Sequence, residues 1–185
     1  MKSLYSYFTV NGSKSNKIIL FDVDDTLIHT TAGIWIKKNN KYIKRISNQE
    51  YNDYKLKPGE SFDFKEFDDQ DILDNEQLTK YWDTLVREYK RGTHIGILTA
   101  RGDCKMIRKF LLKKGIDIKK DLVFATDDPK LGLSGTIQQR KSEVISMLHN
   151  WGYDRFVFFD DNIGNLQTAK ALEKILGVEV ITVKV

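Results

Sequence analysis

Five short apolar segments recur along the chain and predict the strands of one buried sheet. They occupy residues 17–21, 94–98, 121–125, 155–159 and 178–183, with sequences such as KIILF and RFVFF. Their hydrophobicity is continuous rather than alternating, and they are rich in β-branched and aromatic residues. This pattern is typical of strands that are covered on both faces, as in a parallel sheet.

Amphipathic segments between these strands predict helices. Apolar residues recur at helical spacing in residues 74–91, 103–114, 140–151 and 164–176, and a glycine directly follows the second and the fourth of these segments. The alternation of strands and helices predicts an α/β fold. We expect a Rossmann-like three-layer sandwich with a five-stranded, mainly parallel sheet.

The connection after the first strand is far longer than a single crossover helix requires. We therefore assign residues 17–27 and 94–185 to a core domain, and residues 28–93 to a cap or flap insertion over the active face. Residues 1–16 are expected to form an N-terminal arm or an edge strand.

Local signals predict the structure of this insertion. An Asn-Asn pair separates residues 34–38 from residues 41–46, which indicates a β-hairpin. Ser47 and Glu50 have the spacing of a capping box, which indicates that a short helix follows the hairpin.

Charge is distributed unevenly along the chain. The 185 residues include 30 basic and 26 acidic side chains, a net charge of +4. Residues 60–76 contain eight acids and one lysine, so the other residues carry +11 (+4 minus −7). A basic body favours anionic ligands such as phosphates, nucleotides or nucleic acid, although lysines also keep surfaces soluble. The acidic segment either repels nucleic acid from one face or is a solvated linker.

Composition excludes several classes of protein. A hydrophobic content of 41% is enough for a core, which excludes wholesale disorder. No apolar run approaches the roughly 18 residues of a membrane span, and the first residues lack the apolar region of a signal peptide. The single cysteine, Cys104, cannot form an internal disulfide. We expect a soluble cytoplasmic protein.

Two carboxylates follow the first strand at a spacing that suits chemistry. The strand runs directly into the sequence DVDDT, and Asp22 and Asp24 point the same way if the backbone is extended. Ligands of open α/β sheets bind at the carboxyl ends of strands. Two carboxylates there repel one another unless a cation or a proton is present. The pair fits a magnesium-dependent nucleophile with an acid/base partner, or two loop aspartates that cap a turn.

Other strand ends add polar side chains to the same edge. Thr99 and Arg101 follow the second strand, and Asp160 and Asp161 follow the fourth. Lys141 opens the helix that leads to the fourth strand. A turn-capping role for the first two acids does not predict this convergence.

Taken in order, these residues resemble the four motifs of the haloacid dehalogenase (HAD) superfamily, most of whose members are phosphatases. The order and spacing agree over residues 17–183. The matched positions, in motif order, are Asp22, Asp24 and Thr26, then Thr99, then Lys141, and finally Asp160 and Asp161.

The resemblance implies a mechanism. Asp22 would attack phosphorus and become an aspartyl phosphate, while Asp24 would protonate the leaving oxygen and then help water attack. Mg²⁺ would be held by Asp22, the backbone carbonyl of Asp24 and one acid of the final pair. We favour Asp161 as that ligand, with Asp160 pairing to Lys141 or supporting the metal shell.

Further positions complete the implied site. Thr99 and Lys141 would bind and neutralise the phosphoryl oxygens. Arg101 would either add a bidentate phosphate contact or form a surface ion pair. Thr26 would support the loop. Asp25 occupies a position where glycine is common in the family, so we expect its side chain to point to solvent.

An acid at position 24 implies phosphate-ester hydrolysis or phosphomutase chemistry, because dehalogenases and P-type ATPases lack it. The compact size, the basic body and the LTAR sequence are similar to small phage-encoded HAD proteins and to the 3′-phosphatase part of phage-type polynucleotide kinases. This implies a nucleotide or a phosphorylated nucleic-acid end as substrate. The alternatives are a phosphatase that closes its insertion over a sugar phosphate, and a non-catalytic module that binds a phosphorylated ligand. A receiver domain fits poorly, because its phospho-acceptor lies on the third strand.

Overall fold

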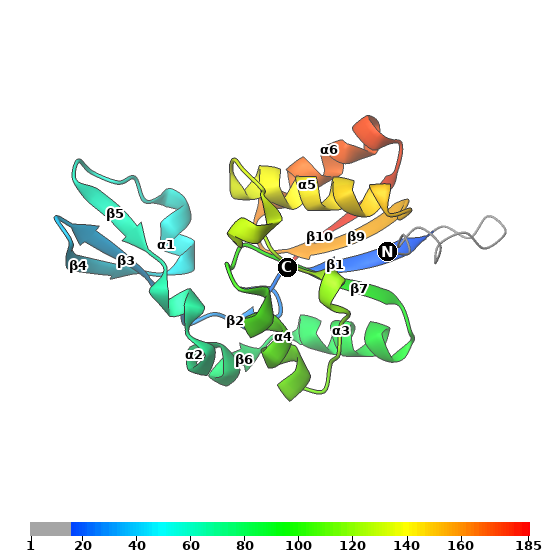
Figure 1. Cartoon of the computed structure of the whole chain (residues 1–185), viewed down its shortest axis with the longest axis horizontal. Helices are drawn as coiled ribbons and strands as arrows, with labels where there is room; N and C mark the ends of the chain where they lie inside the picture. Colours follow the sequence, from blue (N-terminus) through cyan, green and yellow to red (C-terminus); the bar gives the residue numbers. More distant parts are fainter. Residues whose placement is uncertain (1–15) are drawn as a thin grey trace.

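The computed structural model of the chain describes residues 16–185 and places a five-stranded parallel sheet at the centre of the body (Figure 1). Its strands, in spatial order, are β10 (Glu179–Lys184), β9 (Arg155–Asp160), β1 (Lys17–Phe21), β7 (His94–Thr99) and β8 (Val123–Ala125). Every neighbouring pair is parallel. The predicted Rossmann-like α/β fold is thereby confirmed. The N-terminal arm, apart from Asn16, lies outside the described residues.

Two pairs of helices cover the two faces of this sheet (Figure 1). Helices α3 (Lys80–Lys90) and α4 (Cys104–Lys113) pack on one face, and α5 (Ile137–Asn150) and α6 (Ile163–Leu176) pack on the other. The result is the expected three-layer sandwich. None of the helices in residues 16–185 is long and apolar enough to cross a membrane.

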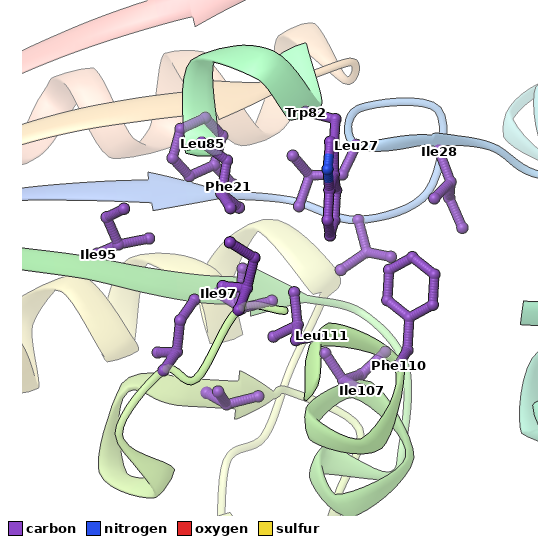
Figure 2. Packing of buried hydrophobic residues seen from close by; sticks show 14 of the residues in the cluster. Phe21, Leu27, Ile28, Trp82, Leu85, Ile95, Ile97, Ile107, Phe110 and Leu111 are labelled. Carbon is purple, nitrogen blue, oxygen red and sulfur yellow. The ribbon is translucent and has the colours of Figure 1, made fainter. Parts of the chain in front are cut away.

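Strand β1 contributes to an apolar core on each side of the sheet. Ile19 and Phe21 pack in the cluster that includes α3 and α4, whereas Ile18 and Leu20 pack in the cluster that includes α5 and α6. Figure 2 shows the first cluster, in which Phe21 lies among apolar side chains from α3, α4 and β7. Burial on both faces explains why the strand is apolar at every position.

The helix predicted over residues 74–91 is wrong at its start. The chain instead forms α2 (Gln70–Asn75), the short strand β6 (Gln77–Leu78) and then α3. Strand β6 pairs antiparallel with β2 (Ile28–His29). The Thr79 hydroxyl accepts a hydrogen bond from the second backbone N–H of α3 and so caps its first turn. Pairing and capping override the helical periodicity here.

Helix α5 begins three residues earlier than predicted. Thr136 and Gln139 form a capping box at its start, each side chain bonding to the other residue's backbone N–H. Lys141 therefore lies one turn inside the helix rather than opening it, and its side chain is buried. The third strand is shorter than predicted, because a 3₁₀ turn, η3 (Lys120–Leu122), precedes it.

The insertion is built around a three-stranded antiparallel sheet beyond the carboxyl ends of the main strands (Figure 1). Its further elements are β3 (Ile34–Lys38), β4 (Lys41–Ile46), α1 (Asn48–Asp53), β5 (Glu60–Asp63) and the 3₁₀ helix η2 (Lys65–Asp68). The predicted hairpin is confirmed, with φ of 50° at Asn39 and 63° at Asn40 as a two-residue type I′ turn requires. The capping box of Ser47 and Glu50 is confirmed as well.

The acidic segment, residues 60–76, is folded, and the linker interpretation is wrong. Within this segment, the Glu66 carboxylate accepts hydrogen bonds from the Gly33 N–H (2.8 Å) and the Trp35 indole N–H (2.6 Å). The same carboxylate forms an ion pair with Arg45 (2.6 Å). Glu66 thus ties parts of the insertion together, and repulsion of nucleic acid by the acidic segment stays a prediction.

Replacing Glu66 by Gln is expected to loosen the insertion in a pH-dependent way. The hydrogen bonds from Arg45 and Gly33 lower the pKa of Glu66 to about 2, although burial opposes them. A lowered folded pKa stabilises the folded form above the ordinary pKa of 4.5, and that stabilisation is lost as the pH falls toward 2. We expect Glu66→Gln to cost about 1 to 3 kcal/mol at pH 7, because the partly buried N–H donors of Gly33 and Trp35 lose a charged acceptor.

Fluorine NMR of protein labelled with 5-fluorotryptophan would report local unfolding at Trp35. The difference between Glu66→Gln and the unsubstituted protein should shrink from pH 7 to pH 3. The exposed Glu143→Gln is the matched control and should show no difference at either pH. An equal effect of Glu66→Gln at both pH values would contradict the assigned role of the charge.

Candidate active site

The loop after β1 is held in place by backbone hydrogen bonds. The Asp22 N–H donates to the Phe159 carbonyl (3.0 Å) and so extends the sheet by one residue. The chain then turns, and the Thr26 N–H donates to the Val23 carbonyl (3.2 Å). Thr26 is fully buried, as a residue that supports the loop would be. Asp22 and Asp24 are therefore presented by a fixed backbone at the carboxyl end of the central strand.

Strand register explains why the acids meet. Phe21 pairs with Phe159 on one side and with Ile97 on the other. Asp22 is consequently level with Asp160 at the end of the neighbouring strand. Because the strands are parallel, their carboxyl ends meet at one edge of the sheet, as the sequence predicted.

A buried lysine connects these two acids. The Lys141 ammonium lies 2.8 Å from the Asp22 carboxylate and 2.7 Å from the Asp160 carboxylate. The two acids raise the pKa of Lys141 by more than burial lowers it, so the lysine stays charged. Asp160 is fully buried, and its carboxylate also accepts from the Asn162 N–H (2.8 Å) and the Asn165 amide (2.9 Å). The expected pairing of Asp160 with Lys141 is present.

Three carboxylates form a group that suits a hard cation. Asp22, Asp160 and Asp161 each offer an oxygen, and these oxygens lie within 4.8 Å of one another. Oxygen donors of this kind are the ligands that Mg²⁺ prefers. Asp160 already accepts from Lys141, Asn162 and Asn165, which makes Asp161 the better candidate for a direct ligand.

The electrostatics of the site favour a divalent cation. Burial raises the pKa of Asp22 well above its ordinary value. The charge of Lys141 lowers this pKa in part, and the neighbouring acids raise it further. Burial and Asp160 raise the pKa of Asp161 to about 6. The carboxyl groups of the site outnumber its basic groups by two, an excess that a divalent ion would balance. The carboxyl groups are those of Asp22, Asp24, Asp160 and Asp161, and the basic groups are Lys141 and Arg101.

Arg101 is buried against Asp24. Its Nε lies 2.9 Å from Asp24 Oδ2 and its Nη2 lies 2.7 Å from Asp24 Oδ1, a bidentate pair. Its Nη1 donates to the carbonyl of Phe67 in the insertion (2.7 Å). The side chain is only 1% exposed, so the alternative of a surface ion pair is wrong: the ion pair that Arg101 forms is buried. In this structure the guanidinium is committed to Asp24 and to the insertion, and a phosphate contact stays a prediction.

Thr99 ends strand β7 at the same edge and is fully buried. Its hydroxyl accepts from the Arg101 N–H (3.3 Å), and its carbonyl accepts from the Thr126 N–H (2.8 Å). Thr99 therefore lies at the expected strand end, next to the Arg101 backbone, and phosphoryl binding by its hydroxyl stays a prediction.

Asp25 is a site residue that sequence reasoning missed. Its φ is +55°, and its carboxylate accepts from the Thr30 N–H (3.2 Å), the Asn48 amide (3.1 Å) and the Gln49 amide (2.7 Å). The expectation that it points to solvent is wrong, because these donors lie against the loop. An aspartate at a position that favours glycine was the signal available in the sequence.

No protein-family model, no curated protein and no solved structure matches this chain.

Proposed function

We propose that the protein is a magnesium-dependent phosphatase that hydrolyses phosphate monoesters through an aspartyl phosphate on Asp22. The observation that carries this proposal is the buried group of Asp22, Lys141 and Asp160 at one strand end, with Asp161 within reach of a shared cation. A second acid, Asp24, follows two residues after Asp22 in the same loop. This arrangement provides a nucleophile, a charge-neutralising lysine and an acid/base partner.

Hydrolysis of the phosphate ester takes two steps. In the first, an Asp22 carboxylate oxygen bonds to phosphorus, the bond to the leaving oxygen breaks, and Asp24 gives that oxygen its proton. In the second, a water oxygen bonds to phosphorus, Asp24 takes a proton from the water, and the bond between phosphorus and Asp22 breaks. Phosphate leaves, and both aspartates return to their initial states.

Positive charge and hydrogen-bond donors would stabilise the phosphoryl group as it transfers. Lys141 contacts the nucleophile itself, so its ammonium lies beside the oxygen that attacks. Thr99 offers a hydroxyl at the neighbouring strand end. Mg²⁺ held by Asp22, the Asp24 carbonyl and Asp161 would supply Lewis-acid neutralisation of the phosphoryl oxygens.

The surface of the insertion supports a nucleotide or a phosphorylated nucleic-acid end as the substrate. Strand β4 is exposed along most of its length and carries Lys41, Tyr42 and Lys44. Lysines contact backbone phosphates, and an aromatic ring offers a surface on which a base can stack. The basic charge outside residues 60–76 supports the same class of substrate.

Phosphate release with and without Mg²⁺ tests the proposal. The substrates would be an aryl phosphate, nucleoside monophosphates, a sugar phosphate and an oligonucleotide with a 3′-phosphate, with the 3′-hydroxyl oligonucleotide as control. We expect release that requires Mg²⁺, stops on chelation and is fastest on a nucleotide or the oligonucleotide. Folded protein that binds Mg²⁺ but releases no phosphate would reject the phosphatase proposal. Fastest release from the sugar phosphate would reject the proposed substrate class.

A further inference from the structure

Two contacts join the outer part of the insertion, residues 34–68, to the residues around Asp24. At the first, the amides of Asn48 and Gln49, at the start of α1, donate to the carboxylate of Asp25. At the second, the carbonyl of Phe67 accepts from Arg101, whose other nitrogens hold Asp24. One contact ends on the residue next to Asp24 in the chain, and the other ends on the partner of its carboxylate.

These two contacts belong to one packed unit. The apolar cluster of the insertion has Ile34, Ile36 and Ile46 at its centre. Tyr51 from α1 and Phe67 from η2 both pack against this cluster. A shift of the insertion therefore moves the start of α1 and the Phe67 carbonyl together, because close-packed side chains transmit displacement.

Arg101 links the position of the insertion to the position of the Asp24 carboxylate, because it is hydrogen-bonded to both. Its planar guanidinium holds both oxygens of Asp24, which fixes the plane of the carboxylate. The guanidinium carbon also lies 5.2 Å from the centre of the Phe67 ring. If the Phe67 carbonyl moved away, a buried N–H would lose its acceptor, and the guanidinium would have to move with it.

We propose that the docked insertion positions Asp24 for proton transfer, with Arg101 as the positioning residue between the Phe67 carbonyl and the Asp24 carboxylate. This inference rests on the proposed phosphatase function. It has a chemical consequence that depends on the leaving group. An alkyl phosphate needs a proton on its leaving oxygen, whereas a nitrophenyl phosphate releases a stable anion without one.

The test loosens the insertion without changing Asp24 or Arg101. In the double variant Asn48→Ala/Gln49→Ala, we expect the first-turnover rate of leaving-group release to fall about tenfold or more for an alkyl phosphate and to change less than about twofold for nitrophenyl phosphate. The first turnover is measured because the later hydrolysis of the aspartyl phosphate also uses Asp24 and is the same for both substrates. For both substrates, the concentration that gives half of the maximal first-turnover rate should stay close to that of the unsubstituted protein. Asp53→Ala, an exposed position at the end of α1, is the matched control and should change neither rate.

A spectroscopic readout accompanies the kinetics. The Nε–H resonance of Arg101 in nitrogen-15 NMR should shift and exchange faster with water in the double variant, and it should be unchanged in Asp53→Ala. Arg101→Lys keeps the charge but lacks the planar pair of N–H donors, so it should also lower the first-turnover rate for the alkyl phosphate more than that for nitrophenyl phosphate.

Failure of this inference can be told from failure of the proposed function. If the unsubstituted protein is active and the first-turnover rates of the double variant fall equally for both substrates, stay the same for both or rise for the alkyl phosphate, the positioning role is overturned and the phosphatase proposal stands. If the unsubstituted protein cleaves neither substrate, the phosphatase proposal fails. An unchanged Arg101 resonance in the double variant overturns the coupling in either case.

Discussion

Asp22→Asn is expected to abolish phosphate release, with a fall in kcat of at least about 10³-fold. The amide has nearly the shape of the carboxylate but lacks the charged oxygen that must bond to phosphorus. It also removes one of the carboxylates near the shared cation position. Initial rates with the best substrate measure the loss. Acid quenching with labelled substrate should trap the phosphoryl-enzyme in the unsubstituted protein and not in Asp22→Asn.

The variant should remain folded, which separates lost chemistry from lost structure. Burial raises the pKa of Asp22, so the ionised group is disfavoured in the folded state and a neutral amide relieves that cost at neutral pH. We expect the melting temperature without Mg²⁺ to be unchanged or higher. Asp154→Asn, an exposed position before β9, is the matched control and should keep full activity. Labelling of Asp22→Asn equal to that of the unsubstituted protein would show that the nucleophile is another residue.

The strands could be predicted from the sequence because burial on both faces leaves a continuous apolar signal. Every segment predicted as a core strand is a strand of the sheet, with ends that shift by a few residues. The start of the helix predicted over residues 74–91 could not be predicted in this way, because an apolar pattern does not determine it. Its start depends on the pairing of Leu78 with Ile28 and on the Thr79 cap, and helical periodicity registers neither.

The site likewise has contacts that could be predicted from the sequence and contacts that could not. The meeting of Asp22, Asp160 and Lys141 follows from topology, because parallel strands bring their carboxyl ends to one edge. The partners of Asp24 and Asp25 do not follow from topology. Judged from the sequence, the Arg101 side chain could bind an anion, water or Asp24. Its partners in the structure depend on where the insertion packs, because Phe67 of the insertion accepts one of its hydrogen bonds. Such contacts are set by the three-dimensional approach of distant segments.

Lys141→Met is expected to lower the free energy of unfolding by about 3 to 5 kcal/mol at pH 7, because it leaves buried charges without their partner. For a chain of this size, that corresponds to a melting temperature lower by roughly 6 to 20 °C. Lys141 opposes the burial that raises the pKa of Asp22, so its removal makes the ionised Asp22 still less favourable. Methionine has similar length and packs well, which confines the effect largely to charge.

The pH and Mg²⁺ dependence of this variant identify the cause. Burial raises the pKa of Asp22, and protonation of Asp22 removes part of the unpaired charge, so the loss of stability should shrink as the pH falls below neutrality. Added Mg²⁺ should also restore part of the stability, because it supplies positive charge beside the same acids. Lys174→Met, at an exposed position of α6, is the matched control for calorimetry and should stay within about 0.5 kcal/mol of the unsubstituted protein. A Lys141→Met protein as stable as this control at pH 7 would show that Asp22 and Asp160 are not held as a charged pair around Lys141.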